Sequence, residues 1–318
     1  MFNSIINKIK KKPAYFFLAK LLAFLLLVFA IDYAVGNLLH YFYFKQKGGT
    51  EFRTTFSIDN TKADVLIFGS SRANHHYHPY IFEESLKMTY YNTGKDGSSI
   101  IYQYAVLQSV LKRYIPKLII LDIVNKEFIE DADTYDRIAS LLPYYDSHPE
   151  MRRIIELKSR FEKYKLVSKI YPFNSAVLKI ATGNTNSSKK RNPDIKGYIP
   201  LTRKWNQPLT EYVSTVTYRL DYKKIAFYEA FIRDCEKAGI QLFIFVSPYF
   251  GKVAHTDYSF IIADGIAQKY NIPFYDFSTD SLFTSQPSMF ADIRHLNDDG
   301  AKLYSAKVAD KVINHVKK

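Results

Sequence analysis

The sequence predicts a three-layer α/β/α fold in which helices cover both faces of a parallel sheet. Short apolar runs recur along the chain, and the strongest, KLIILDIV at 117–124, is apolar on both sides, as a central parallel strand should be. Segments with helical spacing of apolar residues separate these runs, and strands that alternate with helices are typical of a parallel sheet. With 318 residues, of which 47% are hydrophobic, the chain can bury one good-sized core and is not a disordered protein.

The chain begins with a basic tail, residues 1–13, and an apolar segment in which Lys20 can snorkel to the interface. A spanning helix needs about 20 apolar residues, so we predict a transmembrane anchor at 14–38. The tail contains lysines before the span, which places the amino terminus in the cytoplasm and the carboxyl terminus outside. A cleaved signal peptide is the alternative, but there is no convincing small-x-small cleavage motif. A buried core helix fits poorly, because the segment is apolar around its whole circumference.

Residues 44–62 are polar without periodicity, so we predict a stalk at 39–61, and we predict that residues 62–318 form the α/β domain. The expected strands are 64–68, 89–92, 117–124, 241–246 and 272–277, and the expected helices are 79–86, 98–114, 222–238, 258–270 and 301–316. Residues 130–210 differ from the rest of the domain in their residue pattern, and we predict that they form a mostly helical and loop insertion, including a charged helix over 152–170. The insertion could be a lid, a partner surface or a membrane-hugging element.

The turn after the first strand, in DVLIFGSSRANHHYHP at 64–79, is the first candidate site. Gly69 allows a tight turn where a parallel strand would end, and ligand sites of such sheets lie at the carboxyl ends of strands. A serine that follows, Ser70 or Ser71, can be presented at the mouth of the sheet. The alternative is that one of these serines caps the next helix.

The second candidate pair is Asp292 and His295, in FADIRHLNDDGAKL before the last helix. A spacing of three residues puts both side chains on the same side of a helical turn or tight loop. A carboxylate beside a histidine can orient the ring and stabilise its protonated form, which the base of a nucleophilic serine requires. A lone DxxH is common, but its combination with strand-Gly-Ser-Ser is much less so.

Together these motifs resemble the SGNH/GDSL hydrolase superfamily, and more narrowly its membrane-anchored bacterial members whose first block reads GSSR. The resemblance spans about 62–127 and 240–314 and implies an SGNH (flavodoxin-like) α/β/α domain with a parallel sheet. It places the catalytic nucleophile on Ser71 and the rest of the triad on Asp292 and His295. The chain departs from the common pattern at Ser70, where many members have Asp.

The same resemblance implies an oxyanion hole made by the backbone N–H of Ser71, the second-block glycine and the third-block asparagine. The glycine falls on Gly97, with Gly94 as the less favoured choice, and the asparagine falls on Asn125 in LDIVNKEF. This third block lacks the Gly-x-Asn-Asp pattern of the family, so the role of Asn125 depends on the structure.

The resemblance implies a serine acyl esterase or O-acyltransferase that acts on O-acyl groups of a cell-envelope polysaccharide or glycopolymer through an acyl-enzyme. Similar proteins, including the D-alanyl transfer protein of teichoic-acid modification, sit on the bacterial cytoplasmic (inner) membrane with the catalytic domain outside, in the periplasm. Some work with a membrane-bound O-acyltransferase. No cofactor is expected. The alternative is a non-catalytic glycan-binding or scaffolding partner of such a transferase that keeps the fold.

Four further residues near these motifs have open roles. Arg72 could hold a carboxylate or phosphate of the substrate, or an acidic side chain of the protein itself. His75, His76 and His78 do not give a clean facial set of ligands and have no carboxylate close in sequence, so we predict no metal.

Cys235 is the only cysteine, which excludes an internal disulfide, and we expect it to be buried in packing.

The formal net charge of +13 comes in part from the amino-terminal lysines and in part from 189–204, which has six basic residues against Asp194. Outside the cytoplasm this stretch suits an anionic polysaccharide or anionic headgroups, and a solvated loop is the alternative. Nucleic acid is not an expected partner, because no nucleic-acid motif is present. Aromatic residues reach 16%, and we expect most of them in the core.

Overall fold

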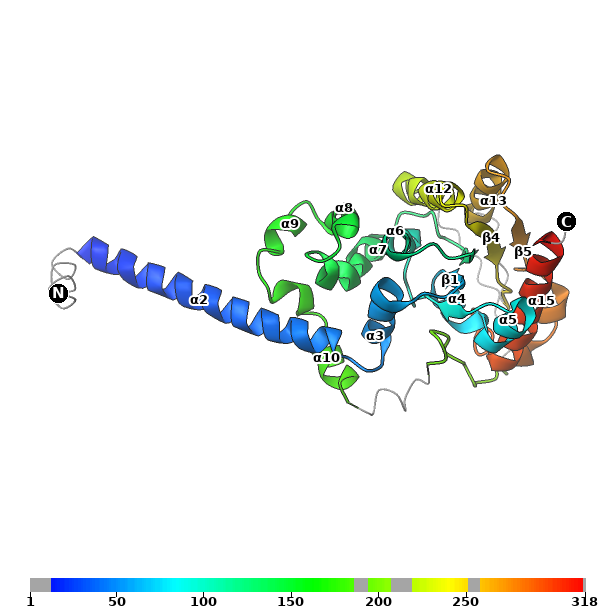
Figure 1. The fold of residues 1–318 in the computed structure, drawn as a ribbon, viewed down its shortest axis with the longest axis horizontal. Coiled ribbons are helices and arrows are strands. Elements are labelled where there is room, and N and C mark those ends of the chain that lie inside the picture. The colour runs from blue at the N-terminus through cyan, green and yellow to red at the C-terminus, as the bar shows by residue number, and fades with distance from the viewer. Residues whose placement is uncertain (1–12, 186–193, 207–218, 251–257, 317–318) are drawn as a thin grey trace.

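A parallel sheet of five strands forms the centre of the domain in the computed structural model, which describes residues 13–185, 194–206, 219–250 and 258–316 (Figure 1). The strand order is β2-β1-β3-β4-β5, which is the flavodoxin-like order. The strands are β1 Val65–Phe68, β2 Tyr90–Asn92, β3 Leu118–Asp122, β4 Gln241–Val246 and β5 Phe274–Asp276. All five predicted strands are present, and the predicted fold class is confirmed.

Alternation along the buried strands divides the core into two halves. Successive side chains of a strand point to opposite faces. Accordingly, Leu66 and Phe68 of β1 join one apolar cluster, whereas Val65 and Ile67 join the other. Every residue of β1 and of β3 is buried, which explains why both strands are apolar throughout instead of alternating.

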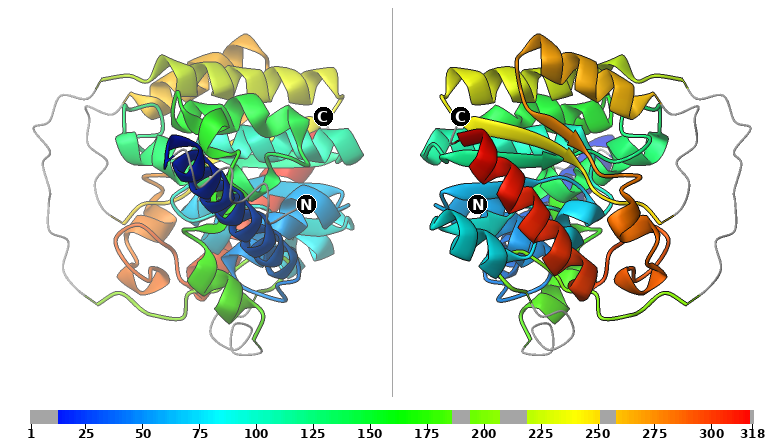
Figure 2. Two further views of the ribbon diagram at one scale, coloured as in Figure 1. Left: turned by 90° about the vertical axis from the view of Figure 1, so that its left-hand side faces the viewer. Right: turned by 90° about the vertical axis from the view of Figure 1, so that its right-hand side faces the viewer.

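Helices cover both faces of the sheet (Figure 2). On one face lie α6 (Ile100–Arg113), α12 (Tyr222–Lys237) and α13 (Ser259–Lys269), which supply Val106, Phe231 and Ala263 to the first cluster. On the other lie α4 (Ser71–His76), α5 (Pro79–Leu86) and α15 (Asp298–Val316), with α14 (Ser281–Thr284) and η6 (Pro287–Met289) before α15. The closing helix begins at Asp298, three residues earlier than the sequence pattern indicates.

The register brings the functional turns to one edge of the sheet. Phe68 at the end of β1 pairs with Leu121 of β3, and Asp122 pairs with Phe245 of β4. The strands are parallel, so the segments that follow β1, β3 and β4 leave the sheet at the same edge. The Ser71 turn and Asn125 therefore lie at this edge.

In its described residues the insertion contains short helical pieces, and the prediction of a continuous helix over 152–170 is wrong. The pieces are α7 (Ala132–Arg137), η2 (Ile138–Tyr144), η3 (Pro149–Met151), α8 (Arg152–Ile155), η4 (Glu156–Lys158), α9 (Glu162–Lys165), η5 (Tyr171–Phe173) and α10 (Val177–Gly183). The helical path breaks at Ser159, whose backbone is extended and whose hydroxyl accepts the N–H of Phe161. A serine that bonds its own backbone in this way favours a turn over a helix.

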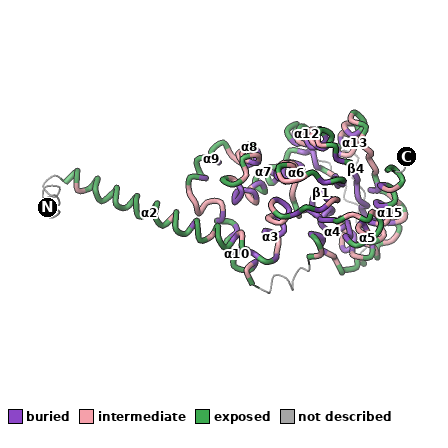
Figure 3. The backbone as a smooth tube through the Cα atoms, viewed as in Figure 1, coloured by how far each residue is buried: buried purple, intermediate pink, exposed green. Residues whose placement is uncertain are grey.

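The N-terminal helix α2 (Pro13–Phe44) is long and apolar enough to cross a membrane, with a mean hydropathy of 2.5 in its most apolar window and none of that window buried (Figure 3). The basic tail 1–12 lies outside the described residues. We expected a stalk at 39–61, but these residues form the end of α2, the helix α3 (Thr50–Thr55) and the π-helix η1 (Phe56–Asn60). They pack on the domain, with Tyr43 and Ile58 in its core. Several of the buried side chains are polar, such as Glu51, so the hydrophobic pattern of the sequence did not indicate this packing.

The basic stretch 189–204 is described only from residue 194 onward. In that part Lys196 forms an ion pair with Glu83, and Lys204 forms one with Asp299. Both contacts fasten the stretch to α5 and α15, so these lysines have partners within the protein.

Candidate active site

Ser71, His295 and Asp292 lie together at the carboxyl edge of the sheet. The Ser71 hydroxyl oxygen is 2.8 Å from Nε2 of His295. On the other side of the ring, Nδ1 of His295 is 3.0 Å from each carboxylate oxygen of Asp292. A carboxylate only accepts hydrogen bonds, so Nδ1 carries the ring proton and Nε2 accepts the proton of Ser71. The three residues thus have the contacts of a nucleophile, a base and an orienting acid.

The local backbone explains how Ser71 reaches this position. Gly69 has φ 143°, and a Cβ there would lie 2.8 Å from the Asp122 carbonyl oxygen and from the Ala73 side chain. The glycine allows β1 to turn sharply into α4, and Ser71 is the first residue of that helix. Ser70 is the residue before the helix and makes no capping bond through its side chain.

The loop before α15 holds Asp292 as a carboxylate. Burial alone would raise the pKa of Asp292, but hydrogen bonds from the His295 ring and from the backbone N–H groups of Arg294 and His295 keep it below its usual range. The carboxyl group therefore stays ionised at neutral pH and faces the imidazole with negative charge.

His76 supports the same loop from behind. Its Nε2 is 2.9 Å from the backbone N–H of Leu296, so that nitrogen accepts and the ring proton sits on Nδ1. Complete burial, with Arg72 nearby, lowers the pKa of His76 well below its usual value, so the ring is neutral. His76 positions the residue after His295 and is not free to bind a metal through Nε2.

The neighbouring histidines, His75 in α4 and His78 before α5, also contact other parts of the protein. Nδ1 of His75 is 2.8 Å from the carbonyl oxygen of Ile199, and Nε2 lies 3.4 Å from Asp96. The His78 ring packs against the Tyr198 ring. Within the described part of the chain, no group of three or more histidine, cysteine or acidic side chains is arranged to hold a metal ion.

A cavity of about 320 Å³ opens in front of Ser71 and brings the predicted site residues together. Its wall includes all residues predicted for the triad and oxyanion hole except Asp292, which lies behind the imidazole: Ser71, Gly97, Asn125 and His295. The other lining residues come from the turn after β1, the turn that leads into α6, the segment after β3, α7, α12, and from Tyr249 and Arg294. A substrate in this cavity would meet the serine and these groups at once.

The two candidate glycines of the second block differ in their surroundings. The N–H of Gly94 donates to the side-chain oxygen of Asn92 at 2.9 Å, and so it is already engaged. Gly97 lines the cavity with φ 66°, and a Cβ there would overlap the guanidinium of Arg137. Any other residue would be strained at this backbone conformation, which makes Gly97 the better of the two sequence-based choices.

Tyr249 orients Asn125, and the sequence analysis did not identify it. The backbone N–H of Asn125 donates to the Tyr249 hydroxyl at 3.0 Å, and that hydroxyl donates to the side-chain oxygen of Asn125. With its oxygen held, the Asn125 side chain is left to present its N–H groups to the cavity. Tyr249 follows Ser247-Pro248 at the end of β4, and this position at a strand terminus was the available signal.

Arg72 is engaged by the protein. Its guanidinium stacks 3.6 Å from the centre of the Tyr249 ring, donates to the carbonyl oxygen of Ser247, and lies 3.9 Å from Asp122. Burial raises the pKa of Asp122, while Arg72 and the hydroxyls of Ser247 and Tyr77 oppose that rise. Of the two roles considered for Arg72, these contacts fit the one in which it pairs with an acid of the protein.

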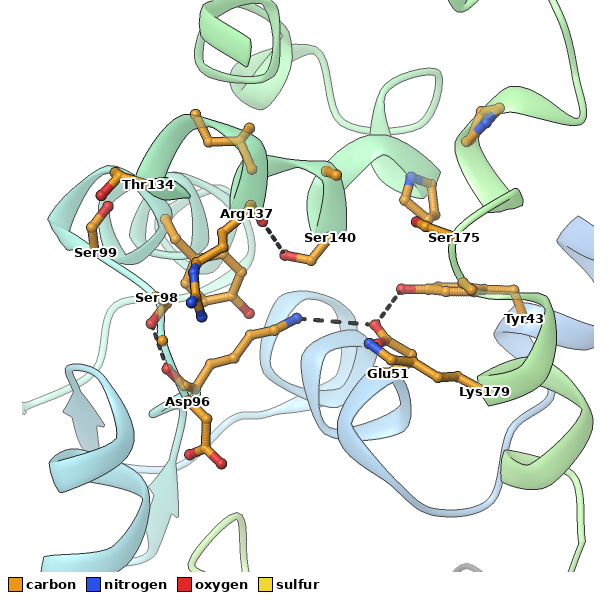
Figure 4. A pocket seen from close by; sticks show the side chains of 18 residues that line it. Tyr43, Glu51, Asp96, Ser98, Ser99, Thr134, Arg137, Ser140, Ser175 and Lys179 are labelled. Atoms are coloured by element: carbon orange, nitrogen blue, oxygen red, sulfur yellow. Dashed lines mark hydrogen bonds and ion pairs between the residues drawn. The ribbon is translucent and has the colours of Figure 1, made fainter. Parts of the chain in front are cut away.

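A second cavity, of about 270 Å³, adjoins the first and runs toward the end of α2 (Figure 4). The two share Gly97, Ser98, Ser99, Thr134 and Arg137. Farther in, the amine of Lys95 is 2.9 Å from the hydroxyl of Thr54 and 4.0 Å from Glu51, which also pairs with Lys179 at 2.8 Å. Burial lowers the pKa of Lys95 to about 8, although Glu51 opposes this effect.

The lowered pKa of Lys95 predicts a pH dependence of stability. A lysine in the unfolded chain has a pKa of about 10.4. Between pH 8 and this value, the unfolded chain therefore binds more protons at Lys95 than the folded protein does. As a result, the free energy of unfolding rises with pH through this window. We expect Lys95→Met to remove this gain, measured as the change in Tm between pH 7.5 and 10 in detergent solution. Lys179→Met, at a side chain that is 62% exposed, is the control. The same change in Tm for wild type and Lys95→Met would contradict the prediction.

No family model matches this chain, and no curated protein sequence matches it. Two solved structures resemble it over most of its length. One is a protein from Bacteroides fragilis NCTC 9343, provisionally described as an acylhydrolase, with 12% sequence identity and a TM-score of 0.43 over 86% of this chain and 100% of that one. The other is an acetyl xylan esterase, with 16% identity and a TM-score of 0.39 over 79% of this chain and 99% of that one. At these values, a functional assignment has to rest on the geometry of the site.

Proposed function

We propose that this protein is a serine-dependent acyl esterase or O-acyltransferase that acts on O-acyl groups of a cell-envelope polysaccharide. The observation that carries the proposal is the contact of the Ser71 hydroxyl with Nε2 of His295 at 2.8 Å, with Asp292 on the other ring nitrogen. This arrangement joins residues that are 224 positions apart in sequence and places the serine in the wall of a cavity.

The contacts suit acyl transfer in two steps. In the first, Nε2 of His295 takes the proton of Ser71 as its oxygen attacks the ester carbonyl carbon, and then gives this proton to the departing alcohol oxygen. In the second, Nε2 takes a proton from water or a sugar hydroxyl, whose oxygen attacks the acyl-serine, and returns it to the Ser71 oxygen. Asp292 remains a carboxylate throughout and stabilises the imidazolium.

The oxyanion formed in each step would meet three donors: the backbone N–H groups of Ser71 and Gly97 and the side-chain amide of Asn125. Their common position on the wall of the first cavity supports this assignment. Donors already in place are effective because they need no rearrangement as negative charge develops, and losing one costs about 10²- to 10³-fold in kcat.

The role of Tyr249 gives a test of the Asn125 assignment. Tyr249→Phe keeps the ring against Arg72 but removes the hydroxyl that holds Asn125. We expect this change to lower kcat for an acyl ester by about tenfold and Asn125→Ala to lower it by about 10²- to 10³-fold. KM should change little, because the oxyanion exists only after attack. If neither variant loses kcat, Asn125 does not serve the oxyanion.

The anchor supports an envelope substrate. Helix α2 can cross a bilayer, and we propose that it holds the domain on the outer, periplasmic side of the bacterial cytoplasmic membrane, with its lysine-rich amino terminus inside. We also propose that residues 62–318 form the SGNH-like catalytic domain, of the GSSR type. We propose a membrane-bound O-acyltransferase as the source of acyl groups, because such an enzyme would lie in the same bilayer.

Acetate release from an O-acetylated polysaccharide tests the proposal. The full chain in vesicles is incubated with acetylated xylan, or with an acylated donor and a deacetylated acceptor, and both free acetate and new glycan esters are measured. Free acetate supports an esterase, and new esters support a transferase. Binding of the glycan with neither product would instead support a non-catalytic scaffold.

A further inference from the structure

Helix α2 docks on the insertion through one stripe that begins at Asp32. The stripe consists of Asp32, Gly36, Leu39 and Tyr43, a spacing that places them on one face of a helix. Residues 17–31, by contrast, are all exposed. The helix is therefore exposed up to residue 31 and is packed on the protein from Asp32 onward. Figure 1 shows α2 projecting from the domain.

The Asp32 carboxylate fastens this first point of contact. It accepts hydrogen bonds from the Ser168 hydroxyl at 2.5 Å and from the backbone N–H of Lys169 at 2.7 Å. One turn later, a Cβ on Gly36 would overlap the Lys169 backbone, so the glycine allows the two chains to touch. These contacts hold the segment after α9 beside Asp32 of α2.

The free part of α2 has the length of a bilayer core. Residues 13–31 rise about 1.5 Å each and span about 28 Å, close to the hydrocarbon thickness of about 30 Å. A span that continued to 38, as the sequence pattern indicated, would draw Asp32 and the docked segment into the hydrocarbon. The docking contacts thus indicate that the periplasmic face of the cytoplasmic membrane lies near Asp32.

Beside this boundary, the α9 segment (residues 160–167) has a polarity opposite to that of a water-facing helix. Its inner side carries Glu162, which is fully buried and bonded to the Tyr171 hydroxyl and to Lys165. Its outer side carries Phe161, Tyr164 and Val167, whose exposed fractions are 51%, 66% and 70%. Figure 1 shows α9 on the side of the domain from which α2 projects.

Basic side chains accompany these apolar ones. Arg160, Lys163 and Lys165 are all exposed, and Arg160 and Lys163 lie over the rings of Phe161 and Tyr164. Apolar and aromatic side chains flanked by lysine and arginine are the composition of elements that lie in the interface of an anionic membrane.

We propose that the α9 segment lies in the headgroup layer of the bilayer and, with the Asp32 contacts, seats the domain on the membrane at a fixed height. The occupant of this face is the lipid surface itself. The inference rests on the proposed anchoring by α2 but not on the chemistry at Ser71. A seated domain would keep its two joined cavities at a constant distance from the membrane.

Spin labels test this seat in the full chain. Tyr164→Cys and Val167→Cys are labelled with a nitroxide and reconstituted in vesicles with one quarter anionic lipid. Tyr222→Cys, at a side chain that is 76% exposed on α12, is the control. The native Cys235 is fully buried, and burial raises the pKa of its thiol, so it does not compete for the label. The ratio of oxygen to water-soluble nickel accessibility should be several-fold higher at 164 and 167 than at 222.

Asp32→Ala should lower this ratio at 164 and 167, because the contacts that hold the segment are lost. Asn37→Ala, which removes a side chain bonded to the Tyr33 carbonyl of the same helix, should leave it unchanged. If the chain resists carbonate extraction and the ratios at 164, 167 and 222 are equal, α2 anchors the chain but the α9 segment does not lie in the headgroup layer. Labels shielded from both oxygen and nickel would also contradict this placement and indicate a protein on this face. Release of the chain by carbonate would instead refute the anchoring by α2. Reaction of Ser71 with a phosphonate is a separate measurement, which tests the proposed chemistry and not the membrane contact.

Discussion

Ser71→Ala is expected to reduce kcat for hydrolysis of a simple acyl ester by about 10⁴-fold or more. The hydroxyl is the group that would become acylated, and no other serine hydroxyl in the described residues contacts His295. The variant should still fold, because Ser71 is the first residue of α4 and its hydroxyl makes one side-chain hydrogen bond, to His295, among the described residues. Initial rates of p-nitrophenyl acetate hydrolysis, together with the melting temperature, measure the effect.

Ser70→Ala is the matched control for this change. Ser70 is the adjacent serine, it makes no capping bond, and its loss should leave kcat within a few-fold of wild type. If Ser70→Ala abolishes turnover while Ser71→Ala retains it, the nucleophile has been placed on the wrong serine. If both keep full activity, the chain does not use this turn for catalysis.

Asp292→Asn is expected to reduce kcat by about 10³- to 10⁴-fold, even though it changes few atoms. The N–H groups of Arg294 and His295 both donate to the same oxygen of Asp292, so in the variant they would hold the amide oxygen. The amide NH₂ would then face Nδ1 of His295, where a donor meets a donor. The ring proton would move to Nε2, and the nitrogen that must accept the proton of Ser71 would no longer be able to do so.

The pH dependence separates this explanation from simple misfolding. The lowered pKa of Asp292 means that its carboxylate stabilises the fold above its unfolded pKa of about 3.9 and that this contribution is lost only as pH falls through the lower, folded value. Near neutral pH the variant loses this stabilisation, so its Tm is measured beside the kinetics. In the folded variant, kcat should fall at an almost unchanged KM. A loss smaller than about tenfold would contradict the orienting role assigned to Asp292.

Local patterns were sufficient to predict the sheet, and together with the family resemblance they pointed to Ser71, Asp292 and His295, which the structure brings into contact. The central strands are short apolar runs that the sequence pattern located, and the Gly69 turn and the DxxH spacing are features of a few consecutive residues. The resemblance also pointed to Gly97 and Asn125, and both line the cavity with Ser71. The strands, the Gly69 turn and the DxxH spacing share one property: the residues that determine each of them are neighbours in the chain.

Contacts between distant segments could not be predicted in this way. The hydroxyl of Tyr249 holds Asn125 across 124 positions, and Tyr77 and Ser247 reach Asp122 from two other parts of the chain. The expected stalk is another example, because residues near Glu51 bury polar groups against the insertion and therefore lack an apolar pattern. The helix expected over 152–170 failed because local turns interrupt a spacing that is otherwise helical.

Reaction with a fluorophosphonate tests the central claim most directly, because that reagent needs an activated serine and no knowledge of the natural substrate. The full chain in detergent or vesicles is treated at neutral pH, and intact mass and peptide mapping follow. We predict one adduct per chain, located on Ser71, absent in Ser71→Ala and strongly slowed in His295→Ala. An unmodified Ser71 in a folded chain, or an adduct on another residue, would contradict the acyl-transfer site and leave a binding function as the better account.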